Sequence, residues 1–131
     1  MASQQNSFAN VATIGIDIGK TTFHLIGQDR RGAIIMRAKL SRTQLMRRLV
    51  NVPQCVIGME PCAGAHHIAR RLSELGHDVR LVPAQYVKPF LKGHKNDYRD
   101  AEAIAEAVQR PTMDFVAIKT PEQCDLLSLH R

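Results

Sequence analysis

The sequence predicts an α/β fold in which a mixed sheet of about five strands is flanked by helices on both faces. Short apolar, β-branched runs bounded by turn residues fill the first third of the chain. After them, such runs alternate with segments of helical periodicity, as in βαβ crossovers. The chain has 131 residues, of which 44% are hydrophobic, so it is long enough for one domain with a real core and too short for two.

Three consecutive strands are expected at 11–18, 21–27 and 33–38, because each segment is apolar and rich in β-branched residues. Gly19 ends the first strand. The polar stretch 28–32, which closes with Gly32, separates the second from the third. These segments predict a meander.

Helices and strands alternate from Ser41 onward. Ser41 is expected to cap a helix that runs to about Val50 and stops before Pro53. The next expected elements are a strand at 54–59, a helix at 64–75 with Gly76 as its C-terminal cap, a short strand at 77–82 and a short helix at 84–91 bent at Pro89.

The last third predicts a helix from Asp97 to Gln109, rich in Ala and Glu, and a final strand at 114–118. Pro121 opens a further helix that is still running at Arg131, with apolar leucines and no cap, so we expect the chain to be cut from a longer protein. The polar residues 1–10 are expected to form a disordered leader, which leaves 11–131 as the domain.

Composition favours an anionic partner, with nucleic acid the most common kind. The net charge is +6 and the pI is near 9.7. The positive charge is clustered in two groups: Arg30, Arg31, Arg37, Lys39, Arg42, Arg47 and Arg48, and then Lys88, Lys92 and Lys95.

Three cysteines without paired spacing predict no disulfide framework and therefore a reduced, cytoplasmic setting. Cys62, His66 and His67 would make a weak zinc site, because no CxxC partner accompanies them. No apolar run approaches membrane-spanning length, so no membrane association is expected.

Four acidic residues stand where they could form one site. Asp17 lies between two isoleucines at the end of the first strand, where an ionised carboxylate is costly unless it is paired or binds a metal. Glu60 ends the fourth strand, directly before a proline. Asp97 and Asp100 are three residues apart on one helix face, so both can point at the same spot.

If the first and fourth strands are neighbours, Asp17 and Glu60 converge at one edge and the late helix brings the other two acids against them. Crowded carboxylates repel unless a cation lies between them, and oxygen ligands select Mg²⁺ or Mn²⁺. Each acid also has a simpler interpretation: Asp17 as a turn residue, Glu60 as a solvated strand end, and Asp97 and Asp100 as helix-capping or first-turn acids.

Together the motifs GIDIGK (Asp17), MEPCAGAHH (Glu60) and KNDYRDAEAIAEA (Asp97 and Asp100) closely resemble the DEDD transposases of bacterial insertion sequences, in the IS-one-ten family, which includes pilin-gene-inverting recombinases. The resemblance runs from about Val11 to the end of the chain, and KxDxxDAxxIA is its most specific stretch.

The resemblance implies an RNase H-like, RuvC-like catalytic domain that binds Mg²⁺ through the four acids and takes part in DNA strand cleavage and exchange. It implies DNA and a guide RNA as partners, a homo-oligomer of the full-length protein, a bacterial cytoplasmic location and a second, C-terminal domain with a nucleophilic serine. Ser128 does not fit that serine. Lys20, Lys95 and Arg99 flank the acids and are candidate nucleic-acid contacts.

Two other functions stay open. IGIDIGKTT resembles the phosphate-gripping hairpin of actin-like ATPases and sugar kinases, which would need a second domain and far more chain. A non-catalytic nucleic-acid-binding module, in which the acids are structural, is the other alternative. With its partner domain missing, the isolated chain is expected to show little or no cleavage.

Overall fold

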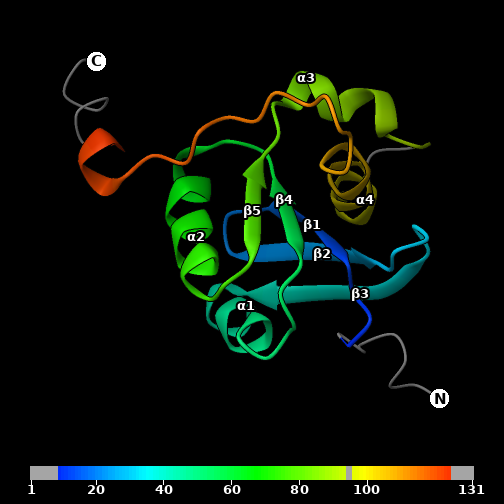
Figure 1. The fold of residues 1–131 in the computed structure, drawn as a ribbon, viewed down its shortest axis with the longest axis horizontal. Helices are drawn as coiled ribbons and strands as arrows, with labels where there is room; N and C mark the ends of the chain where they lie inside the picture. The colour runs from blue at the N-terminus through cyan, green and yellow to red at the C-terminus, as the bar shows by residue number, and fades with distance from the viewer. Residues whose placement is uncertain (1–8, 94–95, 125–131) are drawn as a thin grey trace.

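A computed structural model describes residues 9–93 and 96–124, and its centre is a five-stranded mixed sheet (Figure 1). The strand order is β3-β2-β1-β4-β5, which confirms the predicted sheet. β1 pairs antiparallel with β2 and β2 with β3, whereas β4 lies parallel to β1 and β5 parallel to β4. The strands are β1 (Thr13–Ile18), β2 (Thr22–Gln28), β3 (Ile34–Ser41), β4 (Val56–Met59) and β5 (Asp78–Leu81).

Helices cover both faces of this sheet (Figure 1). The main core lies between the sheet and the helices α1 and α2, and a second cluster lies under α3 and α4 on the other face. The helices are α1 (Arg42–Leu49), α2 (Ala63–Glu74), α3 (Ala84–Val87), the 3-10 helix η2 (Lys88–Phe90) and α4 (Asp97–Ala107). In the described part of the chain, no helix is both long and apolar enough to cross a bilayer.

Strand alternation in β1 decides which side chains reach α4. Ile14 and Ile16 point into the core beneath α1 and α2, so Gly15 and Asp17 face α4. A Cβ atom on Gly15 would lie 2.0 Å from the Ala101 carbonyl oxygen and 2.5 Å from the Ala105 nitrogen. The missing side chain therefore lets the α4 backbone rest directly on β1, which sets how close the helix comes to Asp17.

The helix ends follow the predicted capping chemistry. Ser41 accepts a hydrogen bond from the Gln44 backbone N–H, and the Gln44 side chain accepts one from the Ser41 N–H, so the two form a capping box. Gly76, which follows α2, has a φ of 101°, a conformation that favours glycine. Pro89 interrupts the helix after Val87, and the chain continues as η2.

Most element boundaries lie within about two residues of the prediction, and the two larger differences are the end of β3 and the last predicted strand. β3 runs on to Ser41 instead of ending at 38, because Leu40 continues the alternation of buried and exposed residues. The prediction of a strand at 114–118 is wrong. In this segment Val116 forms an isolated bridge to Leu81, because β5 is only four residues long and Pro83 follows soon after it. The helix predicted from Pro121 is present over 121–124, and the rest of it, like most of the leader, lies outside the described residues.

Candidate metal centre

The two strand-borne acids lie at neighbouring strand ends. In the parallel pair of β1 and β4, Ile16 is opposite Met59. Asp17 is the next residue of β1 and Glu60 the residue directly after β4, so the same register carries the two acids to one edge of the sheet. Both follow a glycine by two residues and therefore share the face that α4 covers.

The other two acids come from the first turn of α4. Asn96 caps this helix, and its side-chain oxygen accepts a hydrogen bond of 2.9 Å from the Arg99 backbone N–H. Because Asn96 fills the cap, Asp97 is not used there, and the capping interpretation of Asp97 is wrong. Asp97 and Asp100 both lie in the first turn, three residues apart.

Electrostatics tie the four acids together. Burial, the negative charges of Asp100 and Asp97, a hydrogen bond donated to Asp97 and the charge of Glu60 raise the pKa of Asp17 from 3.8 to about 7. The carboxyl of Asp17 is thus at the point of holding a proton at neutral pH, because its surroundings supply too little positive charge. A divalent cation would supply that charge, and carboxylate oxygens are ligands that Mg²⁺ and Mn²⁺ accept.

A cavity of about 290 Å³ gives access to three of the acids: Asp17, Glu60 and Asp100. Its wall is completed by α3 and by the segment that leads to α4, including Val87, Leu91 and Lys92. Asp97 opens instead onto a neighbouring cavity of about 550 Å³, beside His24, Arg37 and Tyr98. The acid cluster therefore faces two adjoining hollows.

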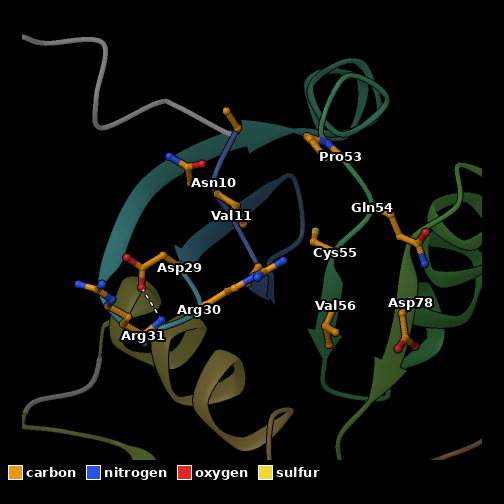
Figure 2. A pocket seen from close by; sticks show the side chains of 12 residues that line it. Asn10, Val11, Asp29, Arg30, Arg31, Pro53, Gln54, Cys55, Val56 and Asp78 are labelled. Carbon is orange, nitrogen blue, oxygen red and sulfur yellow. Dashed lines mark hydrogen bonds between the residues drawn. The ribbon is translucent and has the colours of Figure 1, made fainter.

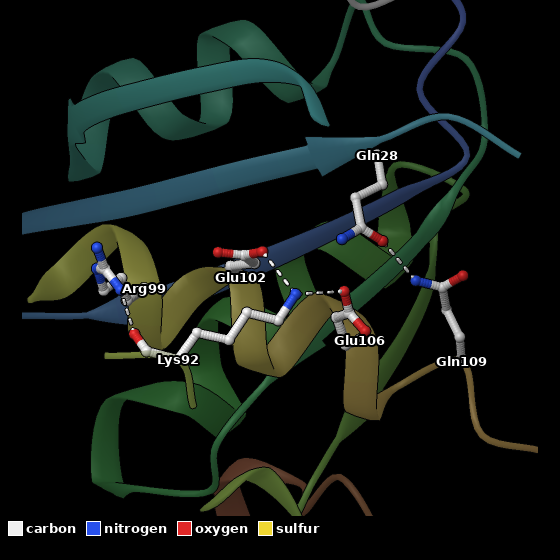
Figure 3. Close-up of polar contacts among 6 residues, drawn as sticks. All are labelled: Gln28, Lys92, Arg99, Glu102, Glu106 and Gln109. Atoms are coloured by element: carbon white, nitrogen blue, oxygen red, sulfur yellow. Dashed lines mark hydrogen bonds and ion pairs between the residues drawn. The ribbon is translucent and has the colours of Figure 1, made fainter. Parts of the chain in front are cut away.

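The segment before α4 is anchored to that helix (Figure 3). The Lys92 ammonium lies 3.3 Å from a Glu102 carboxylate oxygen and 3.5 Å from one of Glu106, and the Arg99 guanidinium donates to the Lys92 carbonyl. Just after the end of α4, the Gln109 side-chain amide donates a hydrogen bond of 2.7 Å to the Gln28 side-chain oxygen. The contacts of Lys92 with Glu102, Glu106 and Arg99 hold this part of the acid-cavity wall against α4.

His24 is a member of the site that the sequence analysis missed. It is directly opposite Asp17 in the antiparallel pair of β1 and β2, and its Nε2 lies 3.7 Å from an Asp97 carboxylate oxygen. The Tyr98 ring packs edge-on against the imidazole, with 4.9 Å between ring centroids. A signal was available: His24 is the single charged or ionisable residue of the strand segment TFHLIG, and strand pairing carries it to the face of Asp17.

The basic candidates take different positions. Lys20 is exposed in the turn between β1 and β2. Arg99 is exposed on α4 but donates to the Lys92 carbonyl, so one of its roles is structural. Lys95 lies outside the described residues.

The structure does not bring Cys62, His66 and His67 together as a zinc site would require. His66 is buried, and its Nδ1 accepts a 3.0 Å hydrogen bond from the Lys119 backbone N–H, whereas Cys62 and His67 are exposed. Among the residues that the structure describes, the group whose ligand atoms come close enough to share an ion is Asp17, His24 and Asp97, and the atoms all lie within 4.8 Å of one another.

A larger cavity, of about 780 Å³, lies at the opposite end of the sheet, before β1 and β4 (Figure 2). Its carboxylates are already engaged: Asp29 accepts hydrogen bonds from the Arg31 and Ala33 backbones in the turn after β2, and Asp78 lies 2.7 Å from Arg80. The geometry therefore favours the smaller acid cavity as the metal centre.

Comparison with known proteins agrees with this architecture. The profile of a transposase family, the DEDD transposases of the IS110 (IS-one-ten) type, matches residues 14–131. The transposase for insertion sequence element IS1328 of Yersinia enterocolitica is 49% identical over 122 residues, which cover 93% of this chain and 36% of the relative. The transposase for IS1111A of Coxiella burnetii is 37% identical over 126 residues, covering 96% and 35%.

Among solved structures, RuvC of T. thermophilus in complex with a Holliday junction substrate superposes with a TM-score of 0.60 at 15% identity, over 79% of this chain and 98% of RuvC. This likeness confirms the RNase H-like, RuvC-like fold. The chain spans about a third of the length of the curated relatives that it matches. The profile match over nearly the whole chain shows that it belongs to the IS110 family of DEDD transposases.

Proposed function

We propose that this chain is the catalytic domain of a transposase that cleaves and exchanges DNA strands with a divalent cation, Mg²⁺ or Mn²⁺, held by Asp17, Glu60, Asp97 and Asp100. The observation that carries the proposal is the convergence of these acids, from two strand ends and one helix turn. Burial of Asp17, and then the negative charges of Asp100, Asp97 and Glu60, raise the pKa of Asp17 to about 7. Metal-dependent phosphodiester transfer needs such a set of oxygen ligands.

Each acid has a role that follows from its position. Asp17 lies nearest the centre, since the other three all act on its pKa, and would contact the cation from the sheet. Glu60 and Asp100 would bind from the same cavity, and Asp97 from the adjoining one. A bound cation would polarise the scissile phosphate and favour ionisation of the attacking hydroxyl.

The DNA would approach from the exposed side of this centre. Lys20, Lys95 and Arg99 are the proposed phosphate contacts, because lysine and arginine supply the sequence-independent part of nucleic-acid binding. The family implies a guide RNA as a second nucleic-acid partner and a homo-oligomeric full-length protein. It also implies a C-terminal domain with a nucleophilic serine, so the domain of residues 11–131 would hold half of a composite site.

Calorimetry of Mg²⁺ and Mn²⁺ binding tests the metal centre on this chain. We expect binding in the wild type, its loss in an Asp17→Asn, Asp100→Asn double variant, and its retention in Asp114→Asn, which removes an exposed acid away from the centre. Binding that survives in the double variant would refute the assignment.

Strand exchange tests the reaction in the full-length protein. Asp100→Asn should abolish exchange of insertion-sequence DNA while the protein stays folded, and Asp114→Asn should leave it intact. Exchange by the Asp100→Asn protein would contradict the proposed role. We expect the isolated chain to cleave DNA little or not at all, and robust Mg²⁺-dependent nicking by it would contradict the composite site.

Family membership decides against the kinase hypothesis, although the hairpin that suggested it is present: the Gly19 N–H donates to the Thr22 carbonyl at 2.9 Å. The non-catalytic module remains the alternative outcome of the metal experiment. Nucleic-acid binding by a chain that binds no divalent cation would support it.

A further inference from the structure

His24 belongs to a row of side chains that crosses the sheet on the face of α4. Strand pairing places His24 opposite Asp17 on one side and opposite Lys39 on the other. Asp97 reaches the same point from α4, with its carboxylate 3.7 Å from the His24 Nε2. One imidazole and two carboxylates, from three different elements, therefore meet at one place.

The position of the imidazole is well defined. The His24 side chain is 12% exposed, and the edge-on contact with Tyr98 restricts the ring, while the Arg37 guanidinium packs over Tyr98 at 5.2 Å from its centroid. By contrast, the Asp97 side chain is 60% exposed, and both His24 and Asp97 line the cavity of about 550 Å³. A rigid donor beside an accessible carboxylate is what a metal ligand requires.

The spacing fits a shared ion. One ligand atom each from Asp17, His24 and Asp97 lies within 4.8 Å of the other two. Ligands about 2.0–2.2 Å from a common metal are separated by at most about twice that distance, so small side-chain adjustments would close the shell. Without a metal, the His24 Nε2 lies 3.7 Å from the Asp97 carboxylate oxygen, and a cation placed between them would be held by both.

We propose that His24 is a metal ligand of this centre, together with Asp17 and Asp97, and that it creates a nitrogen-containing position that favours Mn²⁺ over Mg²⁺. The inference rests on the proposed function. Imidazole suits transition-metal ions, whereas Mg²⁺ is held mainly by oxygen. The centre would thus have two unlike positions that share Asp17: one with His24 and Asp97, and one with the oxygen ligands Glu60 and Asp100, each facing its own cavity.

Pulsed electron paramagnetic resonance of Mn²⁺ bound to the chain tests the ligand directly. We expect a nitrogen hyperfine modulation in the wild-type protein that changes to the ¹⁵N pattern when the protein is made with ¹⁵N-histidine. The signal should vanish in His24→Gln, which keeps a hydrogen-bonding side chain, and persist in the control His67→Gln, which alters an exposed histidine on α2. The wild-type measurement needs no variant to fold.

Titration calorimetry adds the selectivity. His24→Gln should weaken Mn²⁺ binding at least about tenfold, since even the loss of a residue that only supports a metal ligand costs about that much, and weaken Mg²⁺ binding by no more than about twofold. Absence of histidine modulation from Mn²⁺ whose binding depends on Asp17, or equal losses for both ions, would overturn the proposal and leave the four-acid centre standing. Mn²⁺ binding that does not depend on Asp17 would overturn both.

Discussion

Replacing Asp17 by Asn should stabilise the metal-free protein at neutral and alkaline pH. The pKa of Asp17 rises from 3.8 to about 7 because burial, and then the charges of Asp100 and Asp97, disfavour the ionised carboxyl. In a fully buried group, that difference corresponds to about 4 kcal/mol of unfolding free energy. Asp17 is only half-buried, so solvent screening reduces the expected effect to about 2 kcal/mol.

The sign follows from proton linkage. Between pH 4 and pH 7 the folded state holds a proton on Asp17 that the unfolded state has released, so wild-type stability falls as pH rises through this window. Asn carries no such proton. The variant should therefore match or trail the wild type near pH 4 and exceed it by about 2 kcal/mol at pH 8.

Urea denaturation of both proteins with a chelator present, from pH 4 to pH 8.5, measures this difference. Asp114→Asn, an exposed acid elsewhere, serves as the control and should give a difference that does not vary with pH. Added Mg²⁺ should reverse the order at pH 8, because only the wild type binds it well. If the stability difference between the variant and the wild type does not grow from pH 4 to pH 8, the raised pKa of Asp17 is refuted.

Three further perturbations test the packing and the loop that follows α4. Gly15→Ala should cost about 3 kcal/mol in urea denaturation, at the upper end for overpacking, since the new methyl would meet the Ala101 backbone; a cost below about 1 kcal/mol would contradict the close approach of α4. Ser41→Ala should cost about 1 kcal/mol by the same assay through loss of the capping box, and an unchanged stability would contradict that role. Burial, followed by the positive charges of Lys119 and Arg70, lowers the pKa of His66. The neutral His66 ring accepts a hydrogen bond from the Lys119 backbone N–H, so the stability that this contact contributes is present above pH 6.5 and is lost as the pH falls. Hydrogen exchange at the Lys119 amide, corrected for intrinsic rate, should accelerate from pH 7.5 to pH 5, and a constant protection factor would count against the contact.

The fold was largely predictable because its signals are local. Alternating burial in the strands, the Ser41 cap and the Gly76 terminator each act within a few residues, and all three are confirmed. The segment 114–118 was predicted as a strand because its residues are apolar and β-branched. In the structure, Val116 and Ile118 pack against the core from an irregular segment. Whether such a segment adds a strand to the sheet depends on the length of the exposed edge of β5, which the sequence of the segment itself does not determine.

The site was predictable in part. Asp17, Glu60, Asp97 and Asp100 could be named because each is an acid at the end of a strand or in the first turn of a helix. In the structure, the other three lie near enough to Asp17 to raise its pKa. His24 needs a longer inference: the segment TFHLIG singles it out as the one ionisable residue, but its place opposite Asp17 depends on the register between β1 and β2, which follows from the length of the hairpin.

The most direct test of the metal centre is anomalous diffraction from crystals of this chain grown with Mn²⁺. The proposal predicts a manganese peak within about 2.5 Å of an Asp17 carboxylate oxygen, on the side of Glu60 and Asp100 or on the side of Asp97, and no peak there in the Asp17→Asn, Asp100→Asn variant. Full manganese occupancy elsewhere on the protein, with the four carboxylates empty or turned apart, would contradict it.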